Sequence, residues 1–186
     1  AEKNGTINNT GGLYSLGDVA VVHYRNPDEL VRRAAAIIIE GCRLHCGVEY
    51  SPDTTLAITC HTPQSVGRRP SRLSPLRQCS LYTLLERYLD IGAVPKRSYF
   101  ALLSVYATNP EEADKLRELS SAEGTDLYYD YCIQERKSYV EVLEEFRSCR
   151  PPLSELLKAV QVIPPRRYSI ASSPSVNPFK VVCILE

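Results

Sequence analysis

The stretch Pro164-Pro165-Arg166-Arg167-Tyr168-Ser169-Ile170-Ala171-Ser172-Ser173 places a fixed cation, an aromatic ring and a hydroxyl within four consecutive residues, Arg166 to Ser169. In a strand, alternate side chains point to the same face. We therefore expect Arg166 and Tyr168 to share one face, with Arg167 and Ser169 on the other. A cation beside an aromatic ring suits a ligand that has an anionic part and a flat part.

Flavin and nicotinamide dinucleotides are ligands of this kind. An arginine guanidinium holds a pyrophosphate through two parallel hydrogen bonds, which a lysine ammonium does less well. The Tyr168 ring can stack on a flavin. The alternative is an edge strand whose arginine and tyrosine are merely solvated. The motif alone does not exclude that alternative, so the rest of the chain has to decide.

The composition is that of an ordinary globular protein. Of 186 residues, 44% are hydrophobic and 24% are charged, and Lys plus Arg equals Asp plus Glu at 22 each. This balance removes global charge as a reason to expect nucleic-acid or membrane binding. No apolar run approaches the ~20 residues of a membrane span, and no secretory signal is evident. Because the chain contains no Met, we interpret it as a fragment of a longer protein or as a sequence that has lost Met.

Seven cysteines are scattered along the chain. In an intracellular protein an odd, scattered set predicts free thiols in or near cores. One part of the sequence gathers potential metal ligands, namely Cys42, His45, Cys46, Cys60 and His61. Zinc sites use paired, regularly spaced ligands, whereas His45 lies inside the Cys pair here. We therefore predict no metal site.

The first half of the chain predicts a strand, a helix and a loop. A short β-branched run predicts a buried strand at residues 19–24. Asn26 and Pro27 are a typical helix start, and Gly41 is a typical stop. Residues 42–79 contain four prolines and a local run of arginines, which indicates a solvated loop with a short strand at 56–59.

The second half predicts a block of helices followed by strands. Residues 80–157 have apolar positions at helical spacing, with helix starts at Ser80 and Asn109. A strand then contains the Arg166–Ser169 stretch, and another is expected at residues 179–185. β elements at both ends of a helical block predict one β domain that is interrupted by a helical domain and completed later.

Arg166-Arg167-Tyr168-Ser169 resembles the R-x-Y-S flavin motif of the ferredoxin-reductase superfamily. Further stretches resemble the NADPH-dependent diflavin reductases in the same order: Tyr14-x-x-Gly17-Asp18-Val19 followed by Asn26, Tyr88-Leu89-Asp90-Ile91 with Pro95 and Arg97, residues 120–124, and Arg150-Pro151-Pro152. The similarity covers nearly the whole chain except residues 42–79. Residues 94–100 and 130–132 are closer to the diflavin oxidoreductases of cytosolic iron–sulfur assembly than to cytochrome P-450 reductase.

The resemblance implies an α+β fold. A flattened antiparallel flavin-binding β-barrel, present here in part, would carry an inserted all-helical connecting domain. Residues 1–27 would form the first part of this barrel, and residues 159–186 the second part with the R-x-Y-S motif. Residues 28–158 would form the connecting domain, with the loop at 42–79 inside it.

The resemblance also implies FAD as the cofactor. Arg166 matches the arginine that holds the pyrophosphate, and Tyr168 matches the residue stacked on the isoalloxazine. Ser169 matches the hydroxyl near flavin N5 that takes part in hydride transfer, which makes it the catalytic candidate. Alternation puts Ser169 and Tyr168 on opposite faces, so this role requires a bend at Ser169. The other implied FAD-binding residues are Arg136, Arg167, Cys183, Ile184 and Leu185.

By the same resemblance, the parent protein passes electrons from NADPH to FAD, then singly through FMN to a protein acceptor. That acceptor would be an iron–sulfur assembly protein or a cytochrome, in the cytoplasm. The FMN and NADPH domains would lie elsewhere in the parent chain, so we do not expect this fragment to oxidise NADPH alone. The alternative is a helical interaction or adaptor module without flavin chemistry.

Overall fold

The structure is a computed structural model, and it describes residues 14, 17–47, 49–58, 78–173 and 180–183. The chain divides into two compact units. The first, called the strand unit here, comprises Ala1–Tyr24 and Pro164–Glu186. The second, called the helical unit, comprises Arg25–Ile163. Each unit therefore has its own set of packing contacts.

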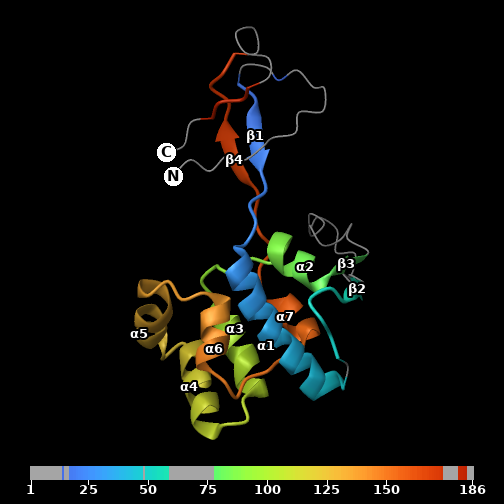
Figure 1. The fold of residues 1–186 in the computed structure, drawn as a ribbon. Coiled ribbons are helices and arrows are strands. Elements are labelled where there is room, and N and C mark those ends of the chain that lie inside the picture. The colour runs from blue at the N-terminus through green and yellow to red at the C-terminus, as the bar shows by residue number, and fades with distance from the viewer. Residues whose placement is uncertain (1–13, 15–16, 48, 59–77, 174–179, 184–186) are drawn as a thin grey trace, which may run out of the picture. The chain divides into compact units, whose positions relative to one another are not determined.

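The strand unit contains one antiparallel pair, β1 (Val19–Val22) and β4 (Arg166–Ser169), which lie side by side in Figure 1. Both strands were predicted from the sequence, and both are formed. The prediction that the first strand is buried was wrong, because β1 belongs to a two-stranded sheet among the described residues and its Val19 and Val21 are 50% and 52% exposed. The strand expected at 179–185 is not formed in its described part, where a single bridge joins Cys183 to Ile170. The described residues of this unit thus form a ladder and a bridge, and no closed barrel is seen among them.

The helical unit is built mainly from α-helices (Figure 1). The helix α3 packs against α4, and α1 contacts α2, α6 and α7. Aromatic and leucine side chains fill the core between them, and Tyr99, Phe100 and Leu116 are fully buried. The helices are α1 (Asp28–Cys46), α2 (Leu81–Arg87), α3 (Arg97–Tyr106), α4 (Pro110–Ser120), α5 (Thr125–Tyr128), the π-helix η1 (Tyr129–Gln134), α6 (Tyr139–Glu145) and α7 (Leu153–Ala159).

Local capping residues begin several of these helices, as the sequence predicted. The Ser80 hydroxyl accepts a hydrogen bond from the Thr83 backbone N–H at the start of α2. Asn109 does the same for the Glu111 N–H before α4, where Pro110 occupies the first turn. A second sheet pairs β2 (Thr55–Ala57) with β3 (Gln78–Ser80) inside the region expected to be a loop. The predicted strand at 56–59 therefore forms one residue earlier, and Thr59 lies outside the described residues.

The bounds predicted for α1 were wrong at both ends. Asn26 does not cap this helix; its buried side-chain amide donates to the carbonyls of Leu85 and Leu89, both at 2.6 Å. Gly41 does not end the helix, which continues to Cys46 and stops before Gly47 at φ 62°. Gly41 is needed for close packing instead, because a Cβ there would lie 2.7 Å from the Pro151 carbonyl oxygen.

Among the described residues, no helix combines the length and the apolar character that a membrane crossing requires.

Candidate flavin-binding site

The register of the β1–β4 ladder sets the two faces of the Arg166–Ser169 stretch. Arg166 pairs with Val22, and Tyr168 pairs with Ala20. Directly opposite residues of an antiparallel pair share a face, and successive residues alternate. Arg166 and Tyr168 therefore lie on one face of the ladder, as strand alternation predicted. Ser169 is on the other face, opposite Val19.

The Arg166 guanidinium contacts the aromatic ring of Tyr24. Its central carbon lies 4.7 Å from the centroid of the Tyr24 ring. Cation–π contact of this kind is worth about 0.5–1 kcal/mol at an exposed site. Among the described residues, Arg166 pairs with no carboxylate. An exposed cation beside the half-buried Tyr168 ring fits a ligand that has both phosphate groups and a flat ring.

Arg167 and Ser169 are exposed on the opposite face of β4. Arg167 pairs with Val21, which is 52% exposed, and Val19 opposite Ser169 is 50% exposed. The described strand keeps regular pairing through Ser169, and the next residue donates its N–H to the Asp18 carbonyl at 3.0 Å. The bend that would turn Ser169 toward the Tyr168 face is therefore not formed in this ladder.

Ser172 connects three segments of the strand unit, which sequence reasoning missed. Its hydroxyl lies 2.9 Å from the Tyr14 hydroxyl and accepts the Val182 N–H at 3.0 Å. Tyr14 also donates to the Lys180 carbonyl at 3.1 Å. These bonds hold the chain just before Cys183, which bridges to Ile170 beside β4. A serine directly after a strand is a signal for such local bonding, but only the fold identifies its distant partners.

Cys183 is the described member of the predicted 183–185 group. It is a half-buried free thiol next to the end of β4. Ile184 and Leu185 lie outside the described residues. The structure thus brings Arg166, Arg167, Tyr168, Ser169 and Cys183 onto one strand pair and the segment beside it.

Arg136 belongs to the helical unit and has an unusual backbone. It is exposed, lies in the turn that follows η1, and has φ 51°. Among the described residues it is the non-glycine residue with positive φ. This left-handed conformation costs roughly 1–2 kcal/mol for a residue with a Cβ. Strained backbone and π-helices both occur preferentially at functional sites.

The cysteine and histidine cluster does not converge in its described part. The His45 ring packs edge-on against Tyr106, with centroids 5.3 Å apart. Within the described residues no group of three or more His, Cys, Asp or Glu side chains could hold a metal ion. Cys60, His61 and the arginines of residues 68–77 lie outside them. The six described cysteines are all free, as predicted, but the expectation that they lie in or near cores fails for Cys46, which is exposed.

Comparison with known proteins identifies the family to which this chain belongs. The model of the FAD binding domain family matches residues 6–185. The chain belongs to that family. Membership makes FAD the cofactor of this chain and disfavours an adaptor module without flavin chemistry.

Curated relatives of this FAD binding domain are named "NADPH-dependent diflavin oxidoreductase 1". That of Danio rerio is 36% identical over 174 residues, which cover 92% of this chain and 27% of the relative. The Bos taurus protein is 37% identical over 182 residues, which cover 94% of this chain and 27% of the relative. The Dictyostelium discoideum protein is 36% identical over 166 residues, which cover 89% of this chain and 24% of the relative. The chain therefore spans about a quarter of the length of these relatives.

Proposed function

We propose that this chain is the FAD-holding region of an NADPH-dependent diflavin oxidoreductase. In that protein electrons would pass from NADPH to FAD, through FMN, and on to a protein acceptor. One observation carries the proposal. In a chain of the FAD binding domain family, Arg166 shares a face of β4 with Tyr168 and pairs with no carboxylate of the described residues. The names of the relatives support the wider electron path.

Each site residue then has a proposed task. Arg166 binds the FAD pyrophosphate through its N–H groups, while Tyr24 holds the guanidinium in place. The Tyr168 ring packs on the isoalloxazine, and the Ser169 hydroxyl hydrogen-bonds near N5 after a local bend of the strand. The FAD itself, when bound, accepts a hydride and releases electrons singly. The remaining proposed FAD contacts come from Arg136, Arg167, Cys183, Ile184 and Leu185.

The two units also receive proposed identities. The strand unit is part of an antiparallel flavin-binding barrel, and the helical unit is the connecting domain inserted into it, with boundaries near residues 27 and 159. The partners are FMN and NADPH domains of the same parent chain and an iron–sulfur assembly protein or cytochrome as acceptor. The six described free thiols support a reducing, cytoplasmic location.

Flavin titration of the purified protein tests the proposal. Arg166→Ala should weaken FAD binding about 30-fold, because a charge-assisted contact worth about 2 kcal/mol is lost. Riboflavin has no phosphate, so its affinity should change less than about twofold. Arg87→Ala removes a matched exposed arginine in the helical unit and should leave FAD binding unchanged. Equal affinity of wild type and Arg166→Ala for FAD would refute the role of Arg166.

The wider function has a separate test. The longer parent protein should purify with FAD and FMN and should oxidise NADPH. A preparation that takes up no flavin at any concentration would overturn the reductase assignment.

A further inference from the structure

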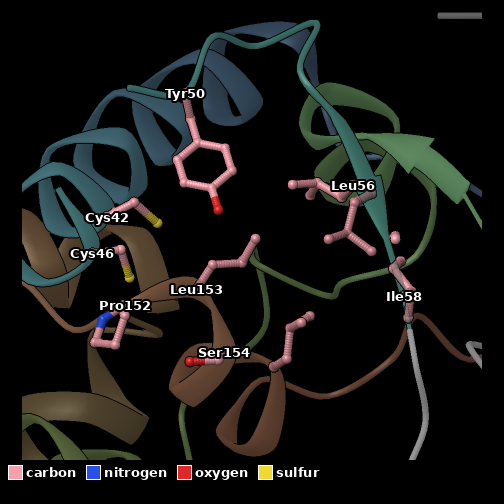
Figure 2. A pocket seen from close by; sticks show the side chains of 11 residues that line it. Cys42, Cys46, Tyr50, Leu56, Ile58, Pro152, Leu153 and Ser154 are labelled. Carbon is pink, nitrogen blue, oxygen red and sulfur yellow. The ribbon is translucent and has the colours of Figure 1, made fainter. Parts of the chain in front are cut away.

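The helical unit contains a hollow of about 360 Å³ that the flavin site does not use. It lies between the end of α1, the stretch around β2, and α7 (Figure 2). Its walls come from residues that are far apart in sequence, so it is a product of the tertiary fold. The lining residues are Cys42, Cys46, Tyr50, Leu56, Ala57, Ile58, Leu84, Pro152, Leu153, Ser154 and Leu157.

The described side chains that line this hollow are mainly apolar, and none of them is charged. Seven of its residues are aliphatic, and the polar groups are two thiols and two hydroxyls. A charged ligand would lose its hydration here without gaining a partner of opposite charge. Small-molecule sites are typically concave, mostly apolar and a few hundred Å³ in volume, with a few polar groups that orient the ligand. The hollow therefore selects for an uncharged, mainly apolar molecule.

Tyr50 provides the polar group that would orient such a molecule. Its side chain is half-buried, and the hydroxyl points into the hollow (Figure 2). This hydroxyl forms no hydrogen bond with another described residue. A phenol hydroxyl both donates and accepts, so it can bind an oxygen acceptor or an N–H or O–H donor.

Two thiols one helical turn apart form the wall opposite Leu56 and Ile58 (Figure 2). Cys42 is 3% exposed, and its burial raises the pKa of its thiol. Cys46 is exposed and lines the same hollow. Cys46 is therefore the thiol that a reagent reaches first, and its reactivity reports whether the hollow is occupied.

We propose that this hollow binds a small, uncharged, largely apolar molecule whose single hydrogen-bonding group meets the Tyr50 hydroxyl. The hollow shares no residue with the proposed flavin site, because all its lining residues belong to the helical unit and none is a proposed FAD contact.

The test uses N-phenyl-1-naphthylamine, an uncharged fluorescent probe with two aromatic groups and one N–H. We expect saturable, single-site fluorescence enhancement. Tyr50→Phe should weaken binding about fivefold, because one hydrogen bond is lost. Leu153→Trp should abolish binding by filling the hollow. The matched control Val105→Trp alters a residue that is 77% exposed and outside the hollow, so it should bind normally. The anionic probe 1-anilinonaphthalene-8-sulfonate should bind at least tenfold more weakly.

A second measurement uses the unaltered protein, so it tests the proposal even if the Leu153→Trp variant fails to fold. N-Ethylmaleimide labelling of the unaltered protein is followed at each cysteine by peptide mass spectrometry. Saturating N-phenyl-1-naphthylamine should slow labelling of Cys46 at least fivefold and leave Cys183, in the strand unit, unaffected. Unsaturable fluorescence, or an unprotected Cys46, would overturn the proposal while leaving the flavin assignment standing.

Discussion

The Arg166 guanidinium lies over the Tyr24 ring, 4.7 Å from its centroid, and pairs with no carboxylate of the described residues. The ring restricts the cation without neutralising it. A carboxylate in place of the ring would compete with a phosphate ligand for the same charge. The aromatic partner therefore leaves the full positive charge of Arg166 for an anionic group.

Replacing Tyr24 tests this relationship directly. Tyr24→Leu removes the ring and should weaken FAD binding about two- to fivefold, since a cation–π contact at an exposed site is worth about 0.5–1 kcal/mol. Tyr24→Phe keeps the ring and should bind FAD as the wild type does. Fluorescence titration with FAD measures both. Equal losses in the two variants would show that the ring is not what positions Arg166.

Two substitutions at Arg136 distinguish the effect of backbone strain on stability from the effect of the side chain on FAD binding. Arg136→Gly should raise the free energy of unfolding by about 0.5–1 kcal/mol, because glycine adopts φ 51° without the steric cost. The same variant should weaken FAD binding, because the proposed cation is lost. Arg136→Ala removes the cation but keeps the strain, so it should weaken FAD binding without the gain in stability. Urea denaturation and FAD titration distinguish the two effects.

Gly41 should tolerate no larger residue despite lying inside a helix. Gly→Ala normally stabilises a helix by about 1 kcal/mol. Here the added Cβ would lie 2.7 Å from the Pro151 carbonyl oxygen and 3.0 Å from that of Arg150, so Gly41→Ala should lower the free energy of unfolding by about 1–3 kcal/mol. Gly47→Ala, with open space around its Cβ but φ 62°, is the comparison and should cost about 1 kcal/mol. A stabilised Gly41→Ala protein would contradict this packing.

Glu141 should make stability depend on pH in the acid range. The Ser138 backbone N–H and hydroxyl both donate to this carboxylate at 2.7 Å and hold its pKa below the usual value of 4.5. A carboxyl whose pKa is lowered by folding stabilises the protein above its unfolded pKa, and this contribution is lost as pH falls through the folded pKa. The free energy of unfolding should therefore decrease as the pH is lowered beyond about 4.5.

Glu141→Gln tests this pH dependence, because glutamine keeps an acceptor oxygen but does not titrate. Its stability should fall less steeply than that of the wild type on acidification. Glu123→Gln removes an exposed carboxylate elsewhere in the helical unit and serves as the control. Urea midpoints measured from pH 7 to pH 3 give the comparison. Identical slopes in wild type and Glu141→Gln would exclude the contribution from this cap.

Local residue chemistry determined much of the secondary structure and part of the candidate site. Ser80 and Asn109 begin helices because their side chains cap backbone N–H groups only two or three residues away. The shared face of Arg166 and Tyr168 follows from the alternation of side chains in any strand. These features depend on neighbours in sequence, and so the sequence was sufficient to predict them.

Only the tertiary structure decided the features that depend on distant partners. Gly41 lies inside α1 at a point where the Pro151 backbone approaches too closely for a Cβ. Asn26 donates hydrogen bonds to the carbonyls of Leu85 and Leu89 and does not cap the helix. The ring beneath Arg166 likewise comes from Tyr24, far away in sequence. The partner of a buried polar group, or of a closely packed glycine, comes from a distant part of the chain that the fold brings near. A local sequence pattern does not contain that information.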